Sequence, residues 1–297
     1  MSMIAEPADY GRAESLTPDR GPTVLRIALG GQLRKLREGK GITREAAGEH
    51  IRGSHAKISR LELGRTGFKE RDIRDLLTLY GVIDEAERAQ FFELARQANE
   101  PGWWQRYSDL LPSWFSTYLG LEQAASQIRT YENQLVPGLL QTDAYAHAII
   151  GLGGDSADTE RRVEIRSRRQ EILHRAQPPV IWAVIDEAVL HRPVGGPEVH
   201  SEQLQHLVKM AQLPHVTIQV LPYTAGAVAA AGSAFSILRF PEPQLPDIVY
   251  LEQLSSALYL ERPQDLALYL SVMDRVSVQA LRPDQSRDLL TRYAERA

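Results

Sequence analysis

The chain has 297 residues, of which 43% are hydrophobic and 24% charged, an ordinary globular composition with enough length for two cores. It contains no cysteine, which excludes disulfides, thiolate nucleophiles and cysteine-ligated zinc or iron–sulfur sites. Its net charge of −4 is unevenly spread. Residues 1–80 carry 15 basic and 11 acidic side chains, or +4, and the remainder carries 19 and 27, or −8. A basic module on an acidic body is expected when only one end of a protein contacts phosphate.

The first segment, residues 1–22, combines Pro, Gly and acidic residues without a hydrophobic period, which predicts a disordered tail. It has no apolar central stretch of the kind found in secretory signals. No apolar run elsewhere approaches the length of a membrane span. The absence of cysteine also fits the cytoplasm, so we expect a cytoplasmic protein with no membrane contact.

Residues 23–99 are predicted to form a compact all-α domain of five short helices. Thr23 is expected to cap the first helix, in which leucines recur at helical spacing. The predicted helices are, in order, 23–39, a short helix capped by Thr43, a short helix capped by Ser54, 70–80 and about 84–98.

Residues 100–297, after a boundary at Asn99–Gly102, are predicted to form a second domain with a small sheet flanked by helices. The whole chain is therefore expected to be α+β and mainly helical. Helices are predicted over 119–130, 142–150, 157–176, 197–212, 263–280 and 283–296, with a helical turn at Asp186–Leu190. Strands are predicted over 179–185, 216–223, 233–240, 247–253 and 257–261.

The strongest functional pattern lies in residues 43–63, where two short helices are joined by a tight turn. In a helix-turn-helix unit the second helix enters the major groove of DNA. Gly48 is small enough for the two helices to cross closely. Ile51, Ile58 and Leu61 are expected to fix this crossing from the buried side.

The outer face of the second helix carries the side chains expected to contact DNA. Arg60 suits a bidentate contact with guanine, His55 can donate or accept a hydrogen bond, and Ala56 can make only an apolar contact. Arg44, which begins the first helix, is expected at the phosphate backbone, as are the N–H groups at the two helix N-termini. The predicted DNA-binding residues are Arg44, Ser54, His55, Ala56, Lys57, Arg60 and Arg65.

Residues 26–81 resemble the xenobiotic-response-element family of helix-turn-helix domains, which is related to phage repressors. The stretches LGGQLRKLREGKGITREAA and SHAKISRLELG carry the resemblance. Two positions depart from the family pattern. Arg44 stands where the family usually has Gln, which favours a phosphate contact over an amide contact. The turn glycine is Gly53, with Arg52 before it, so the turn geometry is expected to differ slightly.

Much of the remaining chain resembles the C-terminal domain of actinomycete WhiJ-like regulators. The matching stretches are YLGLEQAASQIRTYENQLVPGLLQTDAYA, DEAVLHRPVGGP, LPHVTIQVLPYTAG, GSAFSILRF and DIVYLE. This resemblance implies a transcriptional regulator that is often encoded beside a small acidic partner protein, which modulates DNA binding. It assigns no ligand-binding residue.

The sequence makes no strong case for an enzyme. None of the eight histidines belongs to a metal-binding or catalytic motif, and the glycine-rich segments at 151–154 and 195–197 lack the spacing of a phosphate loop. Asp186 and Glu187, beside His191, are the best candidates for an acid–base group, but a helix cap with solvated charges is the favoured interpretation. We expect no catalysis, no cofactor and no metal.

Two further segments are interpreted as structural. Three of the four tryptophans lie in residues 103–118, where packing of the second core or between the domains is favoured over a ligand cage. Arginines over 161–169 alternate with glutamates. That alternation indicates a solvated helix face, or a docking face for an acidic partner, and not a second DNA site.

The function predicted from these patterns is sequence-specific transcriptional regulation on double-stranded DNA. A homodimer is expected, because one module reads only a few base pairs. The second domain is expected to modulate DNA binding through a ligand or a partner protein. The alternative is a protein-docking module of a toxin–antitoxin-like pair, with a small acidic partner encoded nearby.

Overall fold

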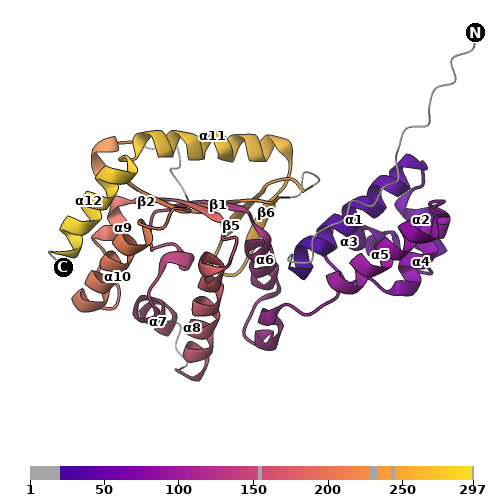
Figure 1. Cartoon of the computed structure of the whole chain (residues 1–297), viewed down its shortest axis with the longest axis horizontal. Coiled ribbons are helices and arrows are strands. Elements are labelled where there is room, and N and C mark those ends of the chain that lie inside the picture. The colour runs from indigo at the N-terminus through magenta and orange to yellow at the C-terminus, as the bar shows by residue number, and fades with distance from the viewer. Residues whose placement is uncertain (1–20, 153–155, 228–232, 242–244, 296–297) are drawn as a thin grey trace, which may run out of the picture. The chain divides into compact units, whose positions relative to one another are not determined.

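The computed structural model of the chain describes residues 21–152, 156–227, 233–241 and 245–295. These residues form two compact units, divided between Trp103 and Trp104 (Figure 1). Residues 1–20 of the predicted tail lie outside the described part of the chain. None of the described helices is long and apolar enough to cross a membrane.

The N-terminal unit is all α, as predicted. Its helices among the described residues are α1 (Pro22–Gly39), α2 (Arg44–His50), α3 (His55–Glu62), α4 (Glu70–Leu79) and α5 (Glu85–Ala98). Apolar side chains from all five enclose one core, in which Leu77 and Ile73 are fully buried. The expected Thr23 cap is wrong. Gly21 is the N-cap and Pro22 takes the first helical position, where its fixed φ suits a helix start.

The C-terminal unit contains a six-stranded sheet flanked by helices, as predicted. The strands β1 (Gln127–Glu132), β2 (Val180–Asp186), β3 (Val216–Leu221), β4 (Phe235–Arg239), β5 (Ile248–Glu252) and β6 (Ala257–Leu260) lie in the order β3-β2-β1-β4-β5-β6. β1, β2 and β3 are parallel to one another. β4 pairs with β1 in antiparallel fashion, and β5 and β6 extend that half of the sheet.

Helices cover both faces of this sheet. Figure 1 shows α11 (Pro263–Gln279) along one face, with α7 (Asp143–Gly151) and α8 (Ser156–Gln170) on the other side. Met273 and Val276 of α11 pack on Tyr131 and Val184 in one buried cluster. The remaining helices are α6 (Ser113–Ala124), α9 (Glu187–Leu190), α10 (Pro197–Met210) and α12 (Pro283–Ala294).

The helix predicted over 119–130 is wrong in its second half. α6 ends at Ala124, and the chain then turns into β1, which lies between β2 and β4. Ser126 begins the pairing, because its N–H donates to Arg239 O at 2.8 Å and its carbonyl accepts from Val180 N–H at 2.9 Å. In β1 the backbone N–H and C=O groups form hydrogen bonds with β2 on one side and β4 on the other. These bonds favour a strand, although the helical residue pattern of α6 continues into this segment.

The arginines of α8 are partly internal, which corrects the predicted solvated face. The Arg169 guanidinium and the Glu122 carboxylate form a bidentate ion pair at 2.7 and 2.8 Å, with the two side chains 7% and 0% exposed. Arg166 NH1 donates to Gln141 Oε1 at 2.9 Å. Arg162 is exposed, and the pair of Arg161 with Asp109, whose side chains are 40% and 58% exposed, also fits the expected solvated arrangement.

The aromatic segment packs inside the C-terminal unit, in line with one of its two predicted structural roles. Trp104 and Tyr118 are buried. The Tyr118 ring stacks on Phe115 at 5.9 Å and on Tyr250 of β5 at 4.1 Å. These rings therefore join α6 to the sheet.

Candidate nucleic-acid interface

The helix-turn-helix consists of α2, the turn over residues 51–54 and α3. The two helices cross at Gly48, where an added Cβ would lie 2.8 Å from Ser54 C and 3.0 Å from His55 N. Only glycine allows this approach, which confirms the predicted role of Gly48. Ile51 and Ile58 are fully buried behind the crossing, again as predicted.

The predicted caps Thr43 and Ser54 are confirmed. Thr43 Oγ1 accepts the Ala46 N–H at 3.2 Å, and Ser54 Oγ accepts the Lys57 N–H at 3.3 Å. Each cap fixes the start of its helix, because it satisfies one N–H group that has no partner within the helix. The recognition helix α3 therefore begins at a defined residue, directly after the turn.

Arg52, in the turn, has a φ of 55° and is the one non-glycine residue with positive φ in the described part of the chain. α2 ends in a Schellman motif, in which Gly53 N–H donates to Gly48 O at 2.8 Å and Arg52 N–H to Glu49 O at 3.0 Å. α1, α3 and α4 end in the same motif with glycine in the left-handed position. In the helix-turn-helix, Arg52 takes that conformation instead of Gly53.

Arg52→Gly is expected to stabilise the N-terminal unit by about 0.5 to 1 kcal/mol. The substitution removes the left-handed strain of a residue with a Cβ, and the greater freedom of glycine in the unfolded chain offsets part of the gain. Denaturant unfolding of the full chain measures the effect. Arg52→Ala is the matched control, since it removes the side chain but keeps the Cβ. Equal stabilities of the two variants would contradict the prediction.

α3 presents two of the predicted DNA contacts to solvent. His55 and Arg60 are exposed, while Ala56 is half-buried. Arg65, in the loop after α3, is exposed as well. Within the described residues no ion pair or side-chain hydrogen bond engages His55, Arg60 or Arg65. The first turn of α3 and its Arg60 thus form a polar surface that is open to a partner.

Two other predicted contacts are already paired with buried carboxylates. Lys57 Nζ lies 2.6 Å from Asp72 Oδ2, and Arg44 Nε lies 3.0 Å from Glu62 Oε2. Both carboxylates are only 2% exposed, whereas Lys57 is 28% and Arg44 37% exposed. Because a buried carboxylate is costly without a cation, these pairs restrict how far either side chain can move towards DNA.

Glu62 and Asp72 are the residues of this interface that the sequence patterns did not reveal. Glu62 also accepts two hydrogen bonds from Arg37 of α1, so its carboxylate links α1, α2 and α3. Asp72 belongs to α4 and joins that helix to Lys57 of α3. Together the two acids fix the orientation of the recognition helix from its inner side.

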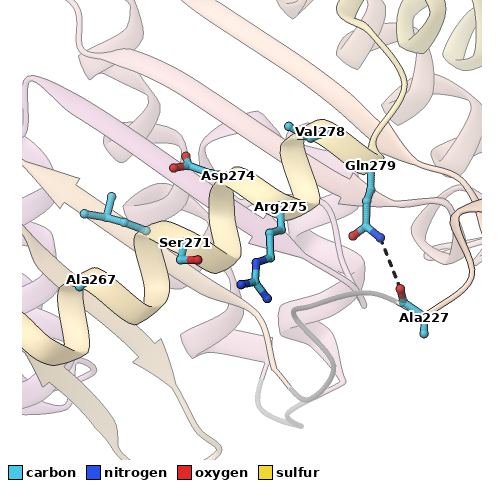
Figure 2. Close-up of a pocket in the computed structure, with 8 residues that line it drawn as sticks. Ala227, Ala267, Ser271, Asp274, Arg275, Val278 and Gln279 are labelled. Atoms are coloured by element: carbon cyan, nitrogen blue, oxygen red, sulfur yellow. Dashed lines mark hydrogen bonds between the residues drawn. The ribbon is translucent and has the colours of Figure 1, made fainter.

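The C-terminal unit contains a surface depression whose lining is mostly uncharged. It has a volume of about 830 Å³ and lies between α11 and Ala227, whose carbonyl accepts a hydrogen bond from Gln279 (Figure 2). Its charged lining residues are Asp274 and Arg275. Asp274 is already paired with Arg129, at 2.6 Å.

Asp186 forms the predicted helix cap, but the neighbouring Glu187 is not solvated as expected, since its side chain is only 15% exposed. Asp186 Oδ1 accepts the Ala188 N–H at 2.9 Å and begins α9. The Glu187 carboxylate accepts hydrogen bonds from Tyr293 OH at 2.9 Å and from Tyr223 N–H at 2.8 Å. Among the described residues, no group of three or more His, Cys, Asp or Glu side chains is placed to hold a metal ion.

Comparison with protein families matches residues 28–91 to a helix-turn-helix domain and residues 115–292 to a domain of unknown function (DUF5753). The comparison with curated proteins finds no similar protein, and the comparison with solved structures finds no similar structure. The helix-turn-helix match covers α2 and α3 completely and indicates a DNA-binding regulator.

Proposed function

Because the chain belongs to the family of the domain of unknown function (DUF5753) and carries a helix-turn-helix domain before it, we propose that it is a sequence-specific transcriptional regulator. One observation supports this proposal most strongly. His55 and Arg60 of α3 are exposed, and neither has a side-chain partner within the described residues. The net charge of +4 on residues 1–80 adds attraction to phosphate.

The finer assignment follows the resemblances described above. We propose that the DNA-binding domain is of the xenobiotic-response-element type and that the C-terminal domain is WhiJ-like. Two copies of the chain bind a palindromic site, because one recognition helix supplies too little affinity and selectivity. The C-terminal domain modulates DNA binding through a ligand or a small acidic partner protein. An acidic partner complements the net charge of +4 on residues 1–80.

The proposed roles differ along the interface. Arg60 reads a base, with His55 beside it at the start of α3. Arg44 contacts phosphate through its two terminal guanidinium nitrogens, since its hydrogen bond to Glu62 uses Nε. Lys57 serves mainly to hold α3 against Asp72.

Arg60→Ala is expected to remove about 1 to 3 kcal/mol of sequence discrimination, because a bidentate arginine–guanine pair contributes that much. Arg44→Ala is expected to weaken binding to all duplexes to a similar degree. A duplex is first selected from a random pool with the full chain. Affinities for this duplex and for a scrambled one are then measured at fixed salt.

Arg71→Ala is the matched control, because Arg71 is an exposed arginine of α4 outside the helix-turn-helix. Its loss removes the same charge from the same unit. Unchanged discrimination in Arg60→Ala, or an equal loss in Arg71→Ala, would refute the base-reading role.

A further inference from the structure

The sheet of the C-terminal unit has two edges, which are the strands β3 and β6. The β3 edge is covered, because Val220 N–H donates to Ser286 Oγ and Val220 O accepts from Leu281 N–H, both at 2.9 Å. Within the described residues, no hydrogen bond from another element reaches the outer backbone groups of β6. The fold therefore covers one edge and leaves the other open.

The pairing of β5 with β6 shows which backbone groups face the open edge. The turn between the two strands is closed by Gln253 N–H, which donates to Ser256 O at 2.9 Å. Hydrogen-bonded and non-hydrogen-bonded pairs alternate in an antiparallel ladder, so Leu258 forms a hydrogen-bonded pair with β5 and its two neighbours do not. The N–H and C=O groups of Ala257 and Tyr259 consequently point away from β5.

Residues 253–260, at this edge, lack the features that normally prevent an edge strand from pairing. The segment QLSSALYL contains no charged residue and no proline. β6 also pairs with β5 in one continuous register, without a bulge. Natural edge strands usually carry charges, prolines or bulges, since an open edge is a template for another strand. The sequence of β6 therefore favours pairing with another chain.

The side chains of β6 hold the strand in place on one face and leave apolar surface on the other. Tyr259 OH donates to Trp114 O at 2.6 Å, and the Tyr259 ring packs on Tyr250 at 5.3 Å. Leu258 points to the opposite face and is 54% exposed. The strand is thus ordered before any partner binds, with a half-covered leucine beside its open backbone groups.

We propose that β6 pairs with β6 of a second copy of this chain, antiparallel about a two-fold axis at Leu258. Ala257 of each copy then lies opposite Tyr259 of the other, and their outward N–H and C=O groups exchange hydrogen bonds across the axis. The two Leu258 side chains form the central non-hydrogen-bonded pair, in which side chains lie closest. The sheet of one copy continues into the sheet of the other.

A second copy suits this edge because the edge is compatible with itself. A two-fold contact brings each residue near the axis against its own equivalent. Residues 253–260 are uncharged, so no like charges meet there, and Glu261 of each copy lies across from Ser255 of the other. One strand pair buries less surface than a standard interface, so we expect a dimer that forms at micromolar concentrations.

This inference rests on the proposed function in one respect, because the contact supplies the two-fold symmetry that a palindromic DNA site requires. Association is measured without DNA, so failure of the β6 contact and failure of DNA recognition give different results. A chain that dimerises through β6 but ignores DNA would refute the regulator assignment alone.

Sedimentation of the full chain from about 1 to 100 µM tests the contact, and the wild type is expected to change from monomer to dimer over this range. Leu258→Lys is expected to raise the dissociation constant at least about tenfold, because two like charges then meet at the axis. Leu254→Lys is the matched control. Leu254 is a fully exposed leucine of the same hairpin, but it lies away from the axis, so this variant is expected to dimerise as the wild type does.

The register can be tested by crosslinking, because the chain has no cysteine of its own. Under mild oxidation Leu258→Cys is expected to form a disulfide-linked dimer, since the facing Cα atoms would lie about 4.5 Å apart, within the reach of a disulfide. Leu254→Cys is expected to remain unlinked, because its two copies would lie on the order of 25 Å apart.

A wild-type chain that stays monomeric over the whole range would overturn the proposal. A dimer that Leu258→Lys leaves intact would also overturn it, because another face would then join the copies, and so would equal crosslinking at positions 254 and 258. A monomer in which the Leu258→Cys thiol resists a thiol reagent would show that a segment of the same chain covers the edge instead. Leu258 is more than half exposed, so its variants are expected to fold, which unfolding curves verify.

Discussion

The full chain with Gly30→Ala is expected to lose specific DNA binding and to be destabilised by about 3 kcal/mol, the upper end of the usual cost of overpacking. Gly30 of α1 lies against the backbone of α3. An added Cβ would overlap Leu61 O and would lie 2.7 Å from Glu62 O. Backbone atoms cannot swing away as a flexible side chain can, so α3 has to shift.

Gly31→Ala is the matched control, because it makes the same substitution one residue further along α1. An added Cβ at Gly31 meets no atom within 4 Å. That variant is expected to gain about 0.5 to 1 kcal/mol, since alanine favours a helix more than glycine does. Denaturant unfolding and DNA affinity are measured for both. Similar behaviour of the two variants would show that α1 and α3 do not approach closely at Gly30.

Glu122→Gln is expected to destabilise the C-terminal unit by about 3 to 5 kcal/mol, the usual cost of removing one partner of a buried ion pair. Glu122 is fully buried and accepts two hydrogen bonds from Arg169, which would be left as an unpaired buried cation. The Arg169 guanidinium also lies over the rings of Phe115 and Tyr118, so its displacement would disturb the aromatic packing.

Glu164→Gln is the matched control for this prediction. Glu164 lies on α8 and pairs with Arg106, but both side chains are more than half exposed. Pairs of this kind contribute little, because water and salt screen them. Calorimetric or denaturant unfolding of the full chain separates the two cases. A loss for Glu122→Gln no larger than that for Glu164→Gln would mean that the buried pair does not hold α6 to α8.

The N-terminal unit was largely predictable because its determinants are local. Caps at Thr43 and Ser54, the small Gly48 and the apolar spacing of α2 and α3 all lie within about twenty residues. The two buried acids were not predictable in the same way. Glu62 and Asp72 occupy helical positions that look solvent-exposed in sequence, and only the packing of four helices reveals their cations.

The C-terminal sheet shows a second limit of prediction from the sequence. The sequence did not predict β1, because no Gly or Pro separates it from α6. Its six residues form a strand through their pairing with β2 and β4.

Site-specific photo-crosslinking tests most directly whether α3 enters DNA. A photoreactive residue replaces His55 in the full chain, and in a second variant it replaces Ile83, which is 88% exposed outside the helix-turn-helix. With the selected duplex at low salt, the residue at position 55 is expected to crosslink to bases of the bound site, and the residue at position 83 is expected to give no crosslink. Crosslinks from position 83 alone, or none from position 55 in a chain that remains folded, would contradict a recognition role for α3.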